Sequence, residues 1–140
     1  MDKSLRYLGI AKRAGMLAVG AETANAVVRA GKACAVISAC DSSEGSMRRS
    51  RINAEDCGVL YCVVPFSKFE LGNVTGRGSP GTLAILDAGI ASAFFDQLAE
   101  KEPERYAHCA EYMKKNTRLT RKNNKKRAGN ATTAKGRTAI

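Results

Sequence analysis

The residues with the clearest binding chemistry lie at positions 20–23, where an extended stretch meets the start of a helix. Residues 16–19 are predicted to be extended, and after Gly20 small or apolar residues recur at positions 24, 27, 28 and 31, the spacing of a helix. The first backbone N–H groups of a helix lack partners and carry partial positive charge. Gly20, Ala21, Glu22 and Thr23 therefore form a candidate phosphate site, although most helix starts bind no ligand.

A second candidate segment is the run 76–81, which has three glycines and a proline in six residues. Such a composition does not form regular structure. It predicts a loop with an exposed backbone, and we take Arg77, Gly78 and Ser79 as candidate contacts for the same ligand.

Catalytic and metal-binding chemistry is not indicated. The five cysteines are too widely spaced for a CxxC pair, and His108 is the only histidine, so neither a zinc site nor a disulfide scaffold is expected. No GxxxxGK[ST] motif occurs. Asp41 and Asp87 are interpreted as a helix-capping and a strand-end residue. We expect no enzyme activity, no cofactor and no metal.

Charge divides the chain in two. Residues 1–100 contain 11 Lys+Arg and 10 Asp+Glu, whereas residues 101–140 contain 12 Lys+Arg and 3 Asp+Glu. A basic tail attracts polyanions, and nucleic acids are the abundant ones in a cytosol. The candidate contacts in the tail are Lys122, Lys125, Lys126 and Arg127. A purely solubilising tail is the alternative.

The elements that must position these residues alternate between helix and strand, which predicts an α/β fold with helices on both faces of a sheet. Apolar and polar residues do not alternate along the predicted strands, as expected for strands that are covered on both faces. Helices are expected at 4–14, 21–31, 43–56, 67–72 and 89–99, and strands at 16–19, 33–39, 59–64 and 82–86.

The tail is expected to hold a short helix at 104–115, with Tyr106, Cys109, Ala110 and Met113 on one side, followed by disorder from residue 116. The predicted domains are therefore 1–100 and a largely disordered basic tail, 101–140. No window has the roughly 20 apolar residues of a membrane span, and the first 15 residues lack the apolar centre of a secretory signal. We expect a cytoplasmic protein with no membrane partner.

Several short sequence motifs, in a fixed order along the chain, resemble those of a known family. In chain order they are Ala11-Lys12-Arg13-Ala14-Gly15 followed by Gly20, Val28-Arg29-Ala30-Gly31-Lys32, a strand ending at Asp41, a strand ending in Val64-Pro65, Lys68-Phe69-Glu70-Leu71-Gly72, Gly76, and Asp87-Ala88-Gly89. Over about residues 4–99 the chain resembles the kink-turn RNA-binding ribosomal-protein family that contains L-seven-Ae and L-thirty-e, and it looks most like the small bacterial branch.

This resemblance implies a three-layer α/β/α sandwich with a mixed four-stranded sheet, no catalysis, and RNA held at one end. In that family the contacts cluster at the start of the second helix and in the loop before the last strand. Those places correspond to residues 20–23 and 76–80 here, and we add Arg29 and Lys32 from the motif Val28-Arg29-Ala30-Gly31-Lys32.

The helix start departs from the family pattern. Kink-turn binders have Gly, any residue, Asn and Glu there, with a Lys one turn later. This chain has Gly20-Ala21-Glu22-Thr23, Ala26 in the lysine position, and Met16 where the bacterial branch carries another lysine. Two polar contacts are thus altered and one cation is missing, although Glu22 can still accept hydrogen bonds from guanine amino groups.

The function predicted from the sequence is that of a non-catalytic, monomeric RNA-binding protein. It would recognise structured, kink-turn-like RNA as a ribosomal or ribosome-associated protein, with RNA and ribosomal proteins as partners. In this hypothesis the globular end selects RNA shape and the tail supplies affinity through phosphate contacts. One alternative is a ribosome-associated protein-interaction module whose tail binds RNA nonspecifically. Another is DNA binding through the tail.

Overall fold

The described residues form ten elements, in which helices and strands alternate in the predicted order until two consecutive helices close the series. The computed structural model describes residues 2–76 and 78–128, with side chains through residue 115. The elements are α1 (Lys3–Arg13), β1 (Leu17–Val19), α2 (Ala21–Arg29), β2 (Ala35–Ser38), α3 (Glu44–Asp56), β3 (Leu60–Val63), α4 (Lys68–Thr75), β4 (Thr82–Ile85), α5 (Ala88–Lys101) and α6 (Pro103–Ala128).

The four strands form one mixed sheet in the order β1-β4-β2-β3, which confirms the predicted sheet. β4 pairs antiparallel with both β1 and β2, and β2 pairs parallel with β3. The register places Ser38 opposite Thr82, and Val19 opposite Leu83. The ends of β1, β2 and β3 therefore meet the beginning of β4 at one edge of the molecule.

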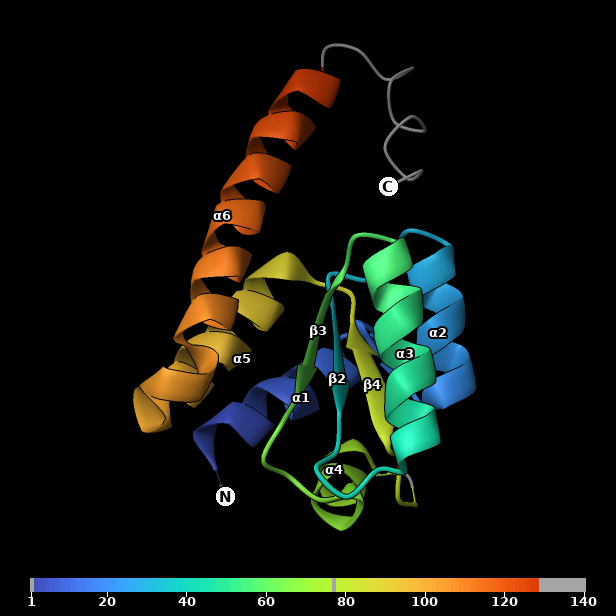
Figure 1. Cartoon of the computed structure of the whole chain (residues 1–140). Coiled ribbons are helices and arrows are strands. Elements are labelled where there is room, and N and C mark those ends of the chain that lie inside the picture. The colour runs from blue at the N-terminus through green and yellow to red at the C-terminus, as the bar shows by residue number, and fades with distance from the viewer. Residues whose placement is uncertain (1, 77, 129–140) are drawn as a thin grey trace.

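Helices cover both faces of the sheet (Figure 1), so the structure is the predicted three-layer sandwich. Leu83 and Ile85 of β4 join the core beneath α1, α5 and α6, whereas Ala84 joins a smaller core beneath α2 and α3. All four β4 residues are buried. Burial on both faces is why the strand lacks an alternating pattern.

The start of α4 is held more firmly than that of the other helices. Ser67 and Glu70 form the reciprocal capping box that their spacing predicts. Asp41 does not cap the helix that follows it, because Ser43 occupies the N-cap of α3. Its carboxylate instead accepts a 2.9 Å hydrogen bond from the N–H of Lys68. Asp41 thus caps a helix 27 residues away.

Helix α6 packs against the domain that the sequence predicts for residues 1–100. Tyr106, Cys109, Ala110 and Met113 are buried in the main core, and the Tyr106 hydroxyl donates to the carbonyl of Val63 at 3.3 Å. The packed unit therefore extends through Met113, because this apolar stripe covers α5 and β3. The backbone of α6 is assigned to Ala128, whereas the side chains from residue 116 onward, where the sequence predicts disorder, lie outside the described residues. The prediction of disorder for residues 129–140 lies outside the described part of the chain.

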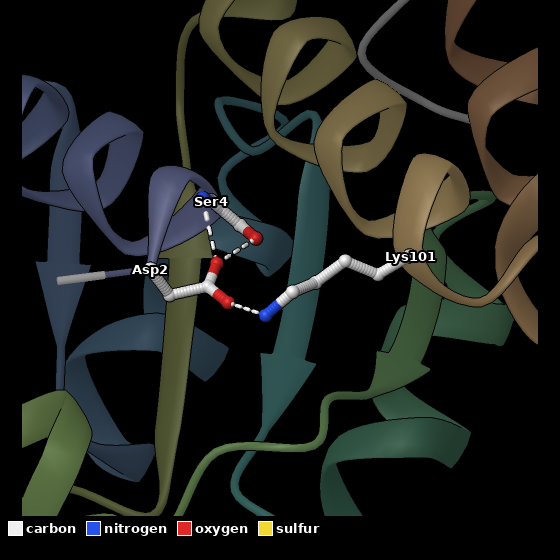
Figure 2. A network of polar contacts seen from close by, with 3 residues as sticks. All are labelled: Asp2, Ser4 and Lys101. Carbon is white, nitrogen blue, oxygen red and sulfur yellow. Dashed lines mark hydrogen bonds and ion pairs between the residues drawn. The ribbon is translucent and has the colours of Figure 1, made fainter.

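A polar contact ties the start of α1 to the end of α5 (Figure 2). Asp2 caps α1 by accepting hydrogen bonds from the N–H and hydroxyl of Ser4, at 2.8 and 2.5 Å, and it pairs with the Lys101 ammonium. Partial burial opposes ionisation of Asp2, but the hydrogen bonds from Lys101 and Ser4 outweigh it and lower the pKa of the carboxyl. Within the described residues, no helix is long and apolar enough to cross a membrane.

Candidate functional site

Gly20 ends β1 and begins α2 in a conformation that other residues avoid. Its φ is 101° and its ψ 149°, a combination that is essentially restricted to glycine. The Gly20 N–H donates to the carbonyl of Thr82 at 2.9 Å, and the Gly20 carbonyl accepts from Ala24 at 2.9 Å. A Cβ added here would meet no atom within 4 Å. The glycine is thus required by the backbone, and open space lies beside it.

The glycine-rich loop ends directly against this helix start. Gly81 accepts hydrogen bonds from the N–H of Ala39 at 2.9 Å and from the hydroxyl of Ser42 at 2.7 Å. A Cβ on Gly81 would lie 2.7 Å from the Ser42 oxygen, so a larger residue does not fit without a shift. We call the edge formed by Gly20, Ser42 and Gly81 the loop end. The two segments singled out by sequence meet there.

Three helices begin at the loop end. α2 follows Gly20, α3 follows the segment of Ser42, and the start of α4 is tied to the same segment through Asp41 (Figure 1). Each helix start carries partial positive charge. Their convergence concentrates backbone dipoles on one surface without requiring a basic side chain.

Side-chain charge at the loop end has both signs. Glu22 and Glu44 are exposed in the first turns of α2 and α3. Arg48 and Arg49 are exposed in the second turn of α3, and the half-buried Lys68 opens α4. The surface is therefore not uniformly attractive to phosphate. It combines helix starts and cations with carboxylates that accept hydrogen bonds from amino groups.

The structure places the predicted site residues in three groups. Ala21, Glu22, Thr23, Gly78 and Ser79 lie at or beside the loop end, and all but the half-buried Ala21 are exposed. Arg77 lies outside the described residues. The third group consists of the predicted residues that are separate from the loop end.

Arg29 and Lys32 are the first members of that separate group. Arg29 is the last residue of the nine-residue α2 and Lys32 comes shortly after it, about 14 Å along the helix axis from Gly20. Nearby, the N–H of Cys34 bonds the carbonyl of Ile85 at the other end of β4. Arg29 and Lys32 therefore lie at the opposite edge of the sheet from residues 20–23, because a helix carries its two termini to opposite edges, and their predicted role in RNA binding stays a prediction.

The predicted tail contacts Lys122, Lys125, Lys126 and Arg127 also lie away from the loop end. They are part of the α6 backbone, which runs out beyond the edge opposite α4 (Figure 1). Their side chains are not described.

A buried hydroxyl beneath the loop end went unnoticed in the sequence. Thr82 is fully buried, and its Oγ1 has no hydrogen-bond partner among the described residues. The carbonyl of the same residue holds Gly20. Sequence reasoning also missed Ser42 and Lys68, whose roles depend on contacts with Gly81 and Asp41. The one local feature of the sequence that could have pointed to Lys68 is that Lys68 and Phe69 lie within the capping box.

The cysteines behave as buried or isolated thiols. All five are free, and no group of three His, Cys, Asp or Glu residues suited to a metal occurs in the described part of the chain. Burial raises the pKa of Cys34 to about 11. The pKa of Cys62 is raised by its hydrogen bond with the Cys109 thiol and by burial. The thiols of Cys34 and Cys62 are therefore protonated near neutral pH.

Many solved structures are similar to this chain, including one from Bacillus halodurans and one from Giardia lamblia. A protein of unknown function from Bacillus halodurans superposes with a TM-score of 0.64 and 24% sequence identity, over 69% of this chain and 97% of that chain. The 15.5kD RNA binding protein of Giardia lamblia superposes with a TM-score of 0.53 and 24% identity, over 74% of this chain and 84% of that chain. No protein-family model and no curated protein sequence matches. The likeness establishes a shared fold.

Proposed function

We propose that this chain is a non-catalytic RNA-binding protein of the kink-turn-binding type, with the RNA held at the loop end. The observation that carries the proposal is the hydrogen bond from the Gly20 N–H to the carbonyl of Thr82, the residue after Gly81, which joins a helix start to the end of a glycine-rich loop. The structural likeness to the Giardia lamblia RNA binding protein supports RNA as the ligand.

The chemistry at the loop end suits a sharply bent RNA. The unpaired N–H groups at the start of α2 offer donors to a phosphate, and the absence of a side chain at Gly20 lets the RNA backbone approach closely. Glu22 accepts hydrogen bonds from guanine amino groups. Because the Glu22 carboxylate also repels phosphates, it favours RNAs that present base edges, rather than phosphates, to the side chain of Glu22.

Affinity for phosphates comes mainly from the extension of α6. The backbone of this helix continues for about 20 Å beyond Met113, and its sequence from residue 114 onward is rich in Lys and Arg. The extension leaves the molecule opposite the loop end, so one RNA has to span the sandwich to contact both. The loop end then selects shape, while the extension adds sequence-independent affinity.

The proposal places the protein in the cytoplasm, as a ribosomal or ribosome-associated monomer with no enzyme activity and no cofactor. The kink-turn pattern has Asn, Glu and Lys at the positions of Glu22, Thr23 and Ala26. These replacements favour one alternative function. In that alternative the loop end docks on a ribosomal protein and only α6 touches RNA.

A binding comparison separates the two functions. The full chain is titrated against a kink-turn RNA and against a straight hairpin of the same length and base composition at moderate salt. Tighter binding of the kink-turn, reduced to the hairpin level by Glu22→Ala but not by Glu55→Ala on α3, supports shape selection at the loop end. Equal binding of both RNAs by the unmodified chain contradicts it and favours the docking alternative.

A further inference from the structure

We infer that Phe69 is a stacking platform for an unpaired RNA base at the loop end. This inference rests on the proposed function and adds a residue that neither the sequence pattern nor the helix start at Gly20 assigned. It starts from one unusual side chain.

Phe69 exposes its ring more than any other large apolar residue in the described part of the chain. Its exposed fraction is 69%, against 38–43% for Ile10, Met16, Ile52 and Tyr112. An aromatic ring left in water contributes nothing to the core, and covering it in a complex is favourable. Phe69 is therefore the side chain with the most apolar surface to gain from a partner.

The turn that carries Phe69 is firmly held. The Ser67 N–H bonds the Glu70 carboxylate at 3.0 Å, the Glu70 N–H bonds the Ser67 hydroxyl at 3.1 Å, and the Lys68 N–H bonds Asp41 at 2.9 Å. These bonds fix the backbone on both sides of Phe69. Little entropy is then lost when a partner covers the ring.

The same turn lies against the glycine-rich loop. The Cδ atom of Lys68 is 3.6 Å from the position of a Cβ on Gly81, and Gly81 is bonded to Ser42. Phe69 thus follows directly on a residue that touches the proposed RNA site. No ion pair engages the Lys68 ammonium among the described residues, which leaves it available to a phosphate.

An aromatic residue that directly follows a lysine in the chain matches one nucleotide, with a base for the ring and a phosphate for the ammonium. A protein partner would instead require a broader apolar patch. Phe69 is the only one of the five exposed large apolar residues that lies on α4. The partner chemistry that fits is a single base splayed out of a bulge or loop, which is how RNA is commonly read.

The first test uses the absence of tryptophan from this chain. In the full-length protein, Phe69→Trp creates a lone fluorescent reporter, and Ile52→Trp on α3 is the matched control. RNA with an unpaired bulge should quench the Phe69→Trp emission strongly, because a stacked base lies against the indole. A fully paired duplex should quench it little, and the Ile52→Trp emission should not respond to either RNA.

The second test measures affinity by the anisotropy of labelled RNA. Phe69→Ala should weaken binding of the bulged RNA about 5- to 150-fold and leave duplex binding unchanged, while Phe69→Tyr retains affinity. If anisotropy shows that the Phe69→Trp protein is saturated with bulged RNA but its emission is unchanged, the stacking role is overturned while the proposed function stands. If the unmodified protein shows no anisotropy change with any RNA, the proposed function fails and the stacking role fails with it.

Discussion

The backbone N–H of Gly20 donates a 2.9 Å hydrogen bond to the carbonyl of Thr82. More than sixty positions separate these two residues in the chain. This bond fixes the start of α2 beside the end of the glycine-rich loop. Because Val19 pairs with Leu83 in the adjoining register, the junction is an extension of the β1–β4 ladder. The rigidity of the candidate site therefore derives from the sheet.

Replacing Gly20 tests whether the junction matters beyond stability. Gly20→Ala should lower the free energy of unfolding by about 1–3 kcal/mol, because alanine is strained at this φ and ψ, and it should also weaken kink-turn binding. Gly15→Ala is the control, since Gly15 also has a positive φ, 73°, and open space around it. Equal losses of RNA binding in the two variants would assign the effect to stability alone.

Replacing Thr82 tests the orphaned hydroxyl. Thr82→Val should raise the free energy of unfolding by about 1 kcal/mol, because a buried hydroxyl without a partner is exchanged for a methyl group. Thr75→Val is the matched control: the Thr75 hydroxyl donates to the Leu71 carbonyl at 2.9 Å, so its loss should destabilise by about 0.5–1.5 kcal/mol. Urea unfolding measures both. Destabilisation by Thr82→Val would show that the hydroxyl has a partner in solution.

Truncation separates the two parts of α6. A chain that ends after Lys115 should keep its cooperative unfolding, whereas one that ends after Lys101 should not fold, because Tyr106, Cys109, Ala110 and Met113 leave the core. Tyr106→Ala in the full chain should cost about 3–5 kcal/mol. Tyr106→Phe should cost about 1 kcal/mol through loss of the bond to Val63. Thermal unfolding checks this prediction. A cooperative transition in the chain that ends after Lys101 would show that the core does not need α6.

The chain that ends after Lys115 also tests the electrostatic role of the extension. With about five phosphate contacts, the slope of log affinity against log salt should be roughly −3.5 to −4.5 for the full chain. The truncated chain should bind all RNAs more weakly and with a shallower slope, while its preference among RNAs is retained. A salt dependence identical in both chains would exclude residues 116–140 from RNA binding.

Acid should weaken the contact between α1 and α5. The folded pKa of Asp2 is lowered below its ordinary value of 3.8, so its contribution is present in full above that value and disappears as the pH falls through the folded pKa. Asp2→Ala should cost about 0.5–2 kcal/mol near pH 7 and nothing at strongly acidic pH. Asp2→Asn keeps the cap but loses the pair with Lys101. A difference between Asp2→Ala and the unmodified chain that persists unchanged in acid would contradict this account.

The sequence by itself determined the order of elements, the doubly covered strands and the two segments with binding chemistry. These features depend on local properties: helical spacing, unbroken apolar runs, the Ser67 and Glu70 capping pair, and a loop that glycine and proline keep irregular. Each property is set by neighbours within a few residues, so it is visible in the chain without its fold.

Only the tertiary structure decided which of those features meet. Antiparallel pairing of β4 brought Gly20 to Thr82, while the length of α2 carried Lys32 to the opposite edge. Packing of Tyr106 drew α6 into the core, and Asp41 capped α4 rather than the helix beside it. These contacts join residues far apart in sequence, and their partners are selected by the geometry of the sheet rather than by local preference.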